Sequence, residues 1–290
     1  SSLIKDDIPV RRDKVVGYWF KDYMLKPLTC ISKAVDEIEE PGIRTVFAAA
    51  LSATARDVML TYRNEIRLRR LEEPYLSDFN PDVLAVFSRR ARLCIERISA
   101  LPRRSRATVV DSDVRSLPFS DNEFDAIVCS PPYGDERNGV PYTQFSRNML
   151  FWLGMADFAR ERKTLSLGFR NGLNNSLSSP PPSMTLYYHL GEICRNERAC
   201  NEAIAFYADY YNSLREMARV VRERVIIVIG QRILSGVVFD NARITVELYK
   251  HLGLQLERYY VRSLPSKRLP KLRVEGGGGI DKEHILVFRK

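Results

Sequence analysis

The sequence predicts an α/β fold: a doubly wound, mostly parallel sheet with an antiparallel C-terminal hairpin, preceded by a helical N-terminal segment. From Ala107 onward, short apolar runs typical of strands covered on both faces alternate with helical stretches. The last two strand-like runs, residues 254–264 and 283–290, are joined by a glycine-rich loop without helical periodicity. Helical periodicity from Val15 to Ser99 sets the first part of the chain apart.

The helical segment is predicted over residues 1–105, as a candidate surface for contact with a partner or with nucleic acid. Apolar residues recur at spacings of three and four through residues 18–38, where Pro27 is expected to interrupt the helix. The next stretch, residues 43–60, is alanine-rich and therefore helix-prone. Asn80–Pro81 is expected to cap a further helix.

The second region, residues 106–290, is predicted to be the catalytic domain. Residues 107–110 ("ATVV") and 124–129 ("FDAIVC") are short apolar or β-branched runs bounded by turn residues, which is typical of strands. The elements expected after them are a helix at 143–155, a helix at about 200–220, a strand at 224–230 and a helix at 240–253.

Composition narrows the class of protein. The chain has 290 residues, 45% of them hydrophobic, enough for one large domain with a helical addition. It has no run of about 18 apolar residues, so no membrane contact is predicted. Five cysteines without CxxC spacing are typical of reduced thiols in a cytoplasmic protein. Three histidines without a cysteine cluster argue against a zinc site, and no metal is expected.

The net charge is +9, because 45 lysines and arginines outnumber 36 acidic residues. Such a surplus suits a polyanionic partner such as nucleic acid, and a basic protein with solvated charges is the alternative. Three clusters concentrate the positive charge: one lies at residues 103–106, and the other two are the candidates for DNA contact. These two consist of Arg67, Arg69 and Arg70, and of Lys267, Arg268, Lys271 and Arg273. For the first of these two, the alternative is a helix face that only contacts solvent.

The segment "CSPPYGD" follows the strand predicted at 124–129, where open α/β sheets bind their ligands. Pro131 and Pro132 stiffen the backbone and offer their carbonyls as acceptors. Ser130 offers a hydroxyl, Tyr133 a flat aromatic face, and the next glycine a sharp turn. A rigid pocket of this kind suits the exocyclic amino group of a planar base extruded from a helix. A proline-stiffened turn without a functional role is the alternative.

These residues resemble the hallmark tetrapeptide of the DNA amino-methyltransferases, (Asp, Asn or Ser)-Pro-Pro-(Tyr, Phe or Trp). Its serine form is typical of the cytosine-N4 enzymes of restriction–modification systems, and its aspartate form of the adenine-N6 enzymes. Residues 111–133 are similar to the strand–acid–strand segment that precedes the catalytic loop, and residues 224–240 and 253–290 to the last three strands. The resemblance runs from about Ala107 to Lys290, and the region before it looks like an insertion that some of these enzymes carry.

The resemblance implies a Rossmann-like fold and methylation of cytosine N4 in double-stranded DNA, with S-adenosylmethionine as the cofactor and no covalent enzyme–base intermediate. The catalytic residues that it implies are Ser130, Pro131, Pro132 and Tyr133. For the cofactor, the candidates are Asp113, Cys129 and Ser130, with an Asx-type turn as the alternative role for Asp113. The alternative functions are adenine-N6 methylation, methylation of RNA or of a protein glutamine, and a catalytically silent DNA-recognition subunit.

The glycine-rich cofactor loop of this family is not found in the sequence. Its pattern, D-P-F-x-G-S-G-T or F-x-G-x-G, matches nothing before Ser130, where Gly17 and Gly42 stand alone. The four consecutive glycines at 276–279 precede a strand and open no helix, so they cannot replace it. We therefore expect one part of a split or truncated methyltransferase, with a second polypeptide supplying the missing loop.

Overall fold

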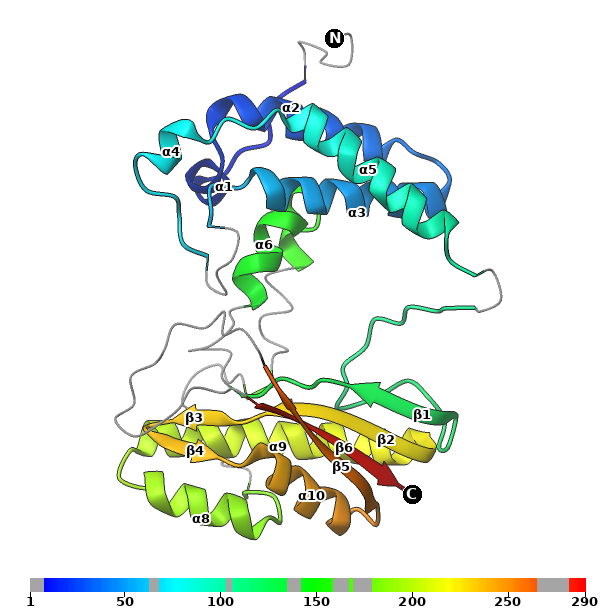
Figure 1. The fold of residues 1–290 in the computed structure, drawn as a ribbon, viewed down its shortest axis with the longest axis vertical. Helices are drawn as coiled ribbons and strands as arrows, with labels where there is room; N and C mark the ends of the chain where they lie inside the picture. Colours follow the sequence, from blue (N-terminus) through cyan, green and yellow to red (C-terminus); the bar gives the residue numbers. More distant parts are fainter. Residues whose placement is uncertain are drawn as a thin grey trace. The chain divides into compact units, whose positions relative to one another are not determined.

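The structure is a computed structural model that describes residues 8–62, 68–102, 106–134, 142–158, 167–168, 179–264 and 282–290. The chain divides into two compact units (Figure 1). The helical unit comprises Ser1–Thr108 and Pro141–Arg162, and the sheet unit comprises Val109–Val140 and Lys163–Lys290. Each unit has its own cluster of buried hydrophobic side chains.

Six of the described helices belong to the helical unit. They are α1 (Lys14–Trp19), α2 (Asp22–Asp36), α3 (Pro41–Val58), α4 (Tyr75–Asp78), α5 (Val83–Ser99) and α6 (Tyr142–Trp152). The cap of α5 is Asp82, which accepts hydrogen bonds from Leu84 N and Ala85 N, and not the expected Asn80–Pro81. Helix α2 continues through Pro27, contrary to the expected interruption. Proline removes only one backbone donor, and the buried residues on both sides of Pro27 hold the helix.

Helix α6 is distant in sequence from the other helices of this unit, yet it supplies a large part of their core. Trp152 is fully buried, and its ring packs edge-on against that of Phe20 with a centroid distance of 5.6 Å. The carbonyl of Trp152 accepts a hydrogen bond of 2.5 Å from Ser32 Oγ. The predicted division into 1–105 and 106–290 therefore differs from the structure, because the apolar face of α6 packs against α2 and α3.

The main sheet of the sheet unit has the strand order β1-β2-β6-β5. β1 (Phe124–Cys129) runs parallel to β2 (Val221–Gly230), whereas β6 (Lys282–Arg289) is antiparallel to both β2 and β5 (Gln255–Ser263). The predicted antiparallel pairing of the last two strands is confirmed. A mostly parallel sheet is not shown, because the described strands of this main sheet form one parallel pair and two antiparallel pairs.

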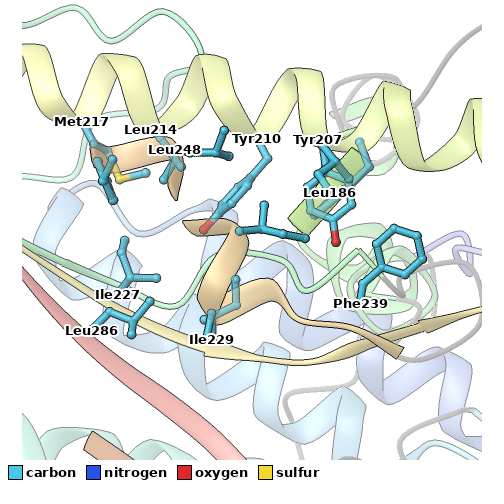
Figure 2. Packing of buried hydrophobic residues seen from close by; sticks show 14 of the residues in the cluster. Leu186, Tyr207, Tyr210, Leu214, Met217, Ile227, Ile229, Phe239, Leu248 and Leu286 are labelled. Carbon is cyan, nitrogen blue, oxygen red and sulfur yellow. The ribbon is translucent and has the colours of Figure 1, made fainter. Parts of the chain in front are cut away.

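Two helices, α9 (Glu197–Val220) and α10 (Asn241–His251), pack on one face of this sheet, and a third helix, α8 (Met184–Ile193), packs against these two (Figure 1). Figure 2 shows the core that results, in which Tyr210, Leu214 and Met217 lie near Ile227, Ile229 and Leu286. Successive side chains of a strand point to opposite faces, and on the other face Ile226, Val228, Ile285 and Val287 are only half-buried. Within the described residues, this sheet carries its helices on one face, so a doubly wound arrangement is not shown.

A short hairpin connects β2 to α10. Its strands are β3 (Arg232–Leu234) and β4 (Val237–Phe239). Ser235 and Gly236 both have positive φ angles, of 50° and 81°, as the tight two-residue turns of hairpins require. The hairpin places Arg232, its first residue, close to the end of β2.

Residues 107–110, which the sequence predicted as a strand, lie outside any strand or helix. Val109 is 97% exposed. In the part of the chain that the structure describes, β1 has no partner on its second edge. A strand needs a neighbour to satisfy its backbone groups, so an apolar composition alone did not make this run a strand.

Candidate active site at the end of the first strand

The loop Ser130–Gly134 leaves the sheet at the carboxyl end of β1. Because β1 and β2 are parallel, this end lies beside the end of β2 at Gly230. The side chain of Asn241 connects the two places: its Nδ2 donates to the carbonyl of Gly230 at 2.9 Å and to that of Tyr133 at 3.1 Å. The expected position of the loop, directly after a strand, is confirmed.

Tyr133 is held at its hydroxyl as well as at its carbonyl. The ring is half-buried and packs against the core of the sheet unit. The hydroxyl donates to Glu283 Oε1 at 3.0 Å and lies 3.4 Å from Ser130 Oγ. Glu283, near the start of β6, also pairs with Arg262. The exposed hydroxyl of Ser130 therefore stands next to an aromatic ring whose position is fixed by two separate contacts.

The end of the loop requires glycine. Gly134 has a φ of +86°, and a Cβ at this position would lie 2.9 Å from Phe206 Cε1 and 3.0 Å from Arg232 Cδ. Arg232 is buried, pairs with Glu202 at 2.6 Å, and places its guanidinium 5.3 Å from the centre of the Phe206 ring. Gly134 thus packs on a buried ion pair and an aromatic ring, which leaves little room for the loop to shift.

Cys129 ends β1 and is mostly buried. Burial raises the pKa of its thiol to about 11, so the thiol is protonated at neutral pH and is a poor nucleophile. Its Sγ lies 3.7 Å from Met217 Sδ. The described contacts of Cys129 are packing contacts, and the predicted cofactor contact of this residue stays a prediction.

An apolar groove of about 420 Å³ lies beside the loop. Its walls come from β1, from Pro131 and Pro132, from α9 and from the segment 114–119. The lining is almost entirely apolar: among its described residues, Tyr210 and Ser213 carry the polar side-chain oxygens. The hydroxyl of Tyr210 is already bonded to Thr245 Oγ1 at 2.9 Å. The groove therefore suits a flat apolar group more than a charged one.

Asp113, predicted to contact the cofactor, forms hydrogen bonds with Arg115, two residues further along the chain. Its Oδ1 accepts from the backbone N–H of Arg115 at 2.9 Å, as in an Asx-type turn. The guanidinium of Arg115 binds both carboxylate oxygens, at 2.6 Å for the shortest contact, and also lies 3.1 Å from Asp209 Oδ2. The hydrogen bonds that the Arg115 guanidinium donates to Asp113 raise the pKa of Arg115 above its ordinary value. The geometry thus matches the turn alternative, and the cofactor role stays a prediction.

The described residues fit one part of S-adenosylmethionine. The adenine ring is flat and could lie against the apolar groove. The ribose hydroxyls, the ammonium and the carboxylate need polar partners, and the hydroxyls of Tyr210 and Ser213 in the described lining are already bonded to Thr245 and to the Asp209 carbonyl. The whole cofactor therefore does not fit the described residues alone.

Of the residues predicted to contact DNA, the structure describes only Arg69 and Arg70. Arg67, Lys267, Arg268, Lys271 and Arg273 lie outside the described residues. The Arg69 guanidinium lies 4.2 Å from the centre of the Tyr62 ring and 3.8 Å from Glu72. The guanidinium of Arg70 lies 4.8 Å from the centre of the Tyr18 ring. Cation–π contacts of this kind leave the arginine charged, so DNA contact by Arg69 and Arg70 stays a prediction.

Three residues that surround the loop were not predicted from the sequence. They are Asn241, Glu283 and Arg232. Asn241 is 108 positions from Tyr133 and Glu283 is 150 positions from it, and no local pattern pairs residues at such separations. The nearest signal is the pair Asp240–Asn241 before a helical stretch, which indicates a helix cap and not a contact with a distant loop.

In the described part of the chain, no helix is long and apolar enough to span a membrane. The same residues contain no group of three or more His, Cys, Asp or Glu side chains that could hold a metal ion.

Comparison with known proteins gives one further observation. The type II methyltransferase M.MvaI of Kocuria varians is 27% identical to this chain over 277 residues. The alignment covers 88% of the chain and 61% of that relative, so the chain spans less than two thirds of the relative's length. No protein-family model and no solved structure matches the chain. The similarity supports the resemblance to DNA methyltransferases that the loop motif indicates.

Proposed function

We propose that this chain carries the base-binding part of a DNA cytosine-N4 methyltransferase of a restriction–modification system. The observation that carries the proposal is the Ser130–Tyr133 loop, which stands at the carboxyl end of a parallel strand with the Ser130 hydroxyl exposed beside a fixed aromatic ring. The similarity to a type II methyltransferase supports it.

In this proposal, the loop binds an extruded cytosine. The Ser130 hydroxyl and the prolyl carbonyls accept hydrogen bonds from the exocyclic amine, and the ring of Tyr133 stacks on the base. Because Asn241 and Glu283 fix Tyr133 at both ends, the base would be held in one orientation, and orientation supplies much of the rate of a direct transfer. S-adenosylmethionine would supply the methyl group.

We further propose that a segment outside these 290 residues completes the cofactor site with a glycine-rich loop. Within the described residues, β1 has an unpaired edge with the apolar groove beside it, and this arrangement supports the proposal because it suits another strand. The segment would be a second polypeptide or another part of a longer protein.

The test is nucleoside mass spectrometry of double-stranded DNA incubated with the chain and S-adenosylmethionine, with and without the candidate completing segment. We expect N4-methylcytosine when the segment is present. N6-methyladenine in its place would favour the adenine alternative, since the amine acceptors of the loop suit both bases. DNA binding without any methylated base in the complete complex would favour a silent recognition subunit.

Two substitutions of Tyr133 distinguish the stacking of its ring on the base from the anchoring of the ring through its hydroxyl. We expect Tyr133→Ala to raise the barrier to methylation by about 1–3 kcal/mol, the cost of one lost base–aromatic stack. Tyr133→Phe keeps the ring and loses only the hydroxyl contacts with Glu283 and Ser130, so its rate should lie closer to that of the parent protein. The check is the single-turnover methylation rate of the complete complex. Equal rates for the alanine and phenylalanine variants would contradict a stacking role.

Ser130→Ala should have a smaller effect. If the prolyl carbonyls supply most of the amine contacts, the substitution removes one hydrogen bond, worth about 0.5–1.5 kcal/mol. The same single-turnover assay measures it. A loss as large as that of Tyr133→Ala would show that the serine hydroxyl is the main acceptor.

The DNA contacts can be tested through the salt dependence of binding. Each phosphate contact that is lost should reduce the slope of log affinity against log salt by about 0.9. We expect this reduction for glutamine substitutions in either basic cluster, measured by fluorescence anisotropy with duplex DNA. Arg243→Gln, at an exposed arginine of α10 that pairs with Glu247, is the matched control. Slopes equal to the control for both clusters would rule out their contact with phosphates.

A further inference from the structure

The side chain of Asn241 joins three elements of the sheet unit. Asn241 is the first residue of α10 and is 1% exposed. Its Oδ1 accepts from the hydroxyl of Tyr207 on α9 at 2.6 Å. Its Nδ2 donates to Gly230 at the end of β2, at 2.9 Å, and to Tyr133 in the loop, at 3.1 Å. Both N–H groups of the amide thus bind backbone carbonyls in a buried position.

The orientation of this amide is set by its surroundings. Burial raises the pKa of Tyr207 above its ordinary value, so its hydroxyl stays protonated and donates to Asn241. The oxygen of the amide therefore faces Tyr207, and the nitrogen faces the two carbonyls. An acceptor in this place could not satisfy the two carbonyls.

The side chain of Asn241 is not needed to cap its own helix. The N-cap of α10 is Asp240, whose carboxylate accepts from Arg243 N at 3.0 Å. The hydrogen bonds of Asn241 are instead made to residues 108 and 11 positions away in sequence. Its amide therefore connects the loop to the sheet and does not start a helix.

We propose that Asn241 is a positioning residue for the base-binding loop: it holds the Tyr133 carbonyl against the end of β2, so that the Ser130 hydroxyl and the prolyl carbonyls keep a fixed arrangement. The role of the loop in base binding rests on the proposed function. The hydrogen bond from Asn241 to the Tyr133 carbonyl lies within this chain, so it can be measured without a methylation assay.

The key variant is Asn241→Asp, which keeps the size of the side chain and its acceptor toward Tyr207. It replaces the donor facing the two carbonyls with an oxygen that repels them when the carboxyl is ionised. An acidic residue in the first turn of a helix is favourable, so α10 itself should not be weakened. The matched control is Thr245→Val, which removes a buried hydroxyl that bonds to Tyr210 on α9 and to the backbone carbonyl of Asn241 but leaves the Asn241 amide in place.

The sequence offers a selective probe of the carbonyl in question. Tyr133–Gly134 is the single Tyr-Gly pair in the chain. Protein labelled with carbonyl-13C tyrosine and 15N glycine should therefore give one correlated NMR signal, which reports the Tyr133 carbonyl carbon directly. Loss of a hydrogen bond to a carbonyl moves its 13C signal upfield.

At pH 8 we expect Asn241→Asp to move this signal upfield, and Thr245→Val to leave it in place. Burial beside two carbonyls raises the pKa of an introduced carboxyl, and its protonated form can donate to one of them. As the pH is lowered, the signal of Asn241→Asp should therefore return toward the parent position. If Asn241→Asp does not fold, Tyr207→Phe, which frees the amide oxygen, should give a smaller shift in the same direction.

In the complete complex, Asn241→Asp should lower kcat on the order of tenfold at pH 8, with recovery at lower pH relative to the parent protein. A Tyr133 carbonyl signal that is the same in Asn241→Asp and Thr245→Val would show that Asn241 does not hold this carbonyl in place. A shifted signal with unchanged kcat would overturn the positioning role. If no complex containing the parent chain methylates DNA, the proposed function fails, and the NMR result still decides whether Asn241 holds the loop.

Discussion

Replacement of Trp152 by alanine should lower the free energy of unfolding of the helical unit by about 3–5 kcal/mol, the usual cost of removing a fully buried aromatic side chain. Trp152 is 0% exposed, packs edge-on against Phe20 and Phe151, and stands at the end of α6. Its loss would leave a cavity between α6 and the earlier helices, and rigid helices do not close such a cavity fully.

The measurement is unfolding by urea, followed by tryptophan fluorescence. The chain has two tryptophans, Trp19 and Trp152, and both belong to the helical unit. In the Trp152→Ala protein, Trp19 therefore reports the unfolding of this unit. Ile98→Ala, at a position that is 50% exposed on α5, is the control and should change stability by no more than about 0.5 kcal/mol. A loss below 1 kcal/mol for Trp152→Ala would mean that α6 does not belong to this core.

Helix α6 was predicted from the sequence, but the surface against which it packs was not. The apolar spacing of residues 143–155 predicted a helix, and α6 is there. Periodicity identifies the apolar face of a helix but not the surface that covers it. Met149 and Trp152 pack into the core of the helical unit, whose other buried residues lie more than 60 positions earlier. The predicted boundary after residue 105 therefore assigned α6 to the other unit.

The sheet was predicted better in its strands than in their pairing. The runs at 124–129, 224–230 and 283–290 all coincide with observed strands to within one residue at the C-terminal end, because apolar composition and length are local properties. The run at 107–110 has a similar composition, but it does not pair with another strand in the described structure. Pairing depends on which strands become neighbours, and the position of β6 between β2 and β5 could not be read from its own residues.

In the candidate site, too, the local features were predicted from the sequence and the long-range contacts were not. The loop at Ser130–Gly134 was predicted from its own residue types, since prolines, a glycine and an aromatic residue after a strand form a local signal. The residues that hold it, Asn241 and Glu283, act across long separations in sequence. For Asp113, the sequence left a turn and a cofactor contact open, and the hydrogen bond from Arg115 N matches the turn.

The second large effect concerns the cofactor. The 290-residue chain alone should bind S-adenosylmethionine weakly or below detection, and a completing segment with the glycine-rich loop should raise the affinity on the order of a thousandfold or more. The groove beside Pro131 and Pro132 offers a wall for the adenine ring. The ammonium, the carboxylate and the ribose would gain their contacts from the completing segment. A hydrogen bond to a charged group contributes roughly 1.5–3 kcal/mol, and 1.4 kcal/mol is tenfold in affinity, so three such contacts account for this factor.

Isothermal titration calorimetry of the chain, with and without the completing segment, measures the difference. Adenosine is the control ligand: if the chain alone holds only the ring, adenosine and S-adenosylmethionine should bind it with similar weak affinity. With the segment present, the affinity for S-adenosylmethionine should rise more than that for adenosine, because adenosine gains only the ribose contacts and lacks the ammonium and the carboxylate. Micromolar binding of S-adenosylmethionine at one site per isolated chain would contradict the proposal, since it would require partners for the charged groups within these 290 residues.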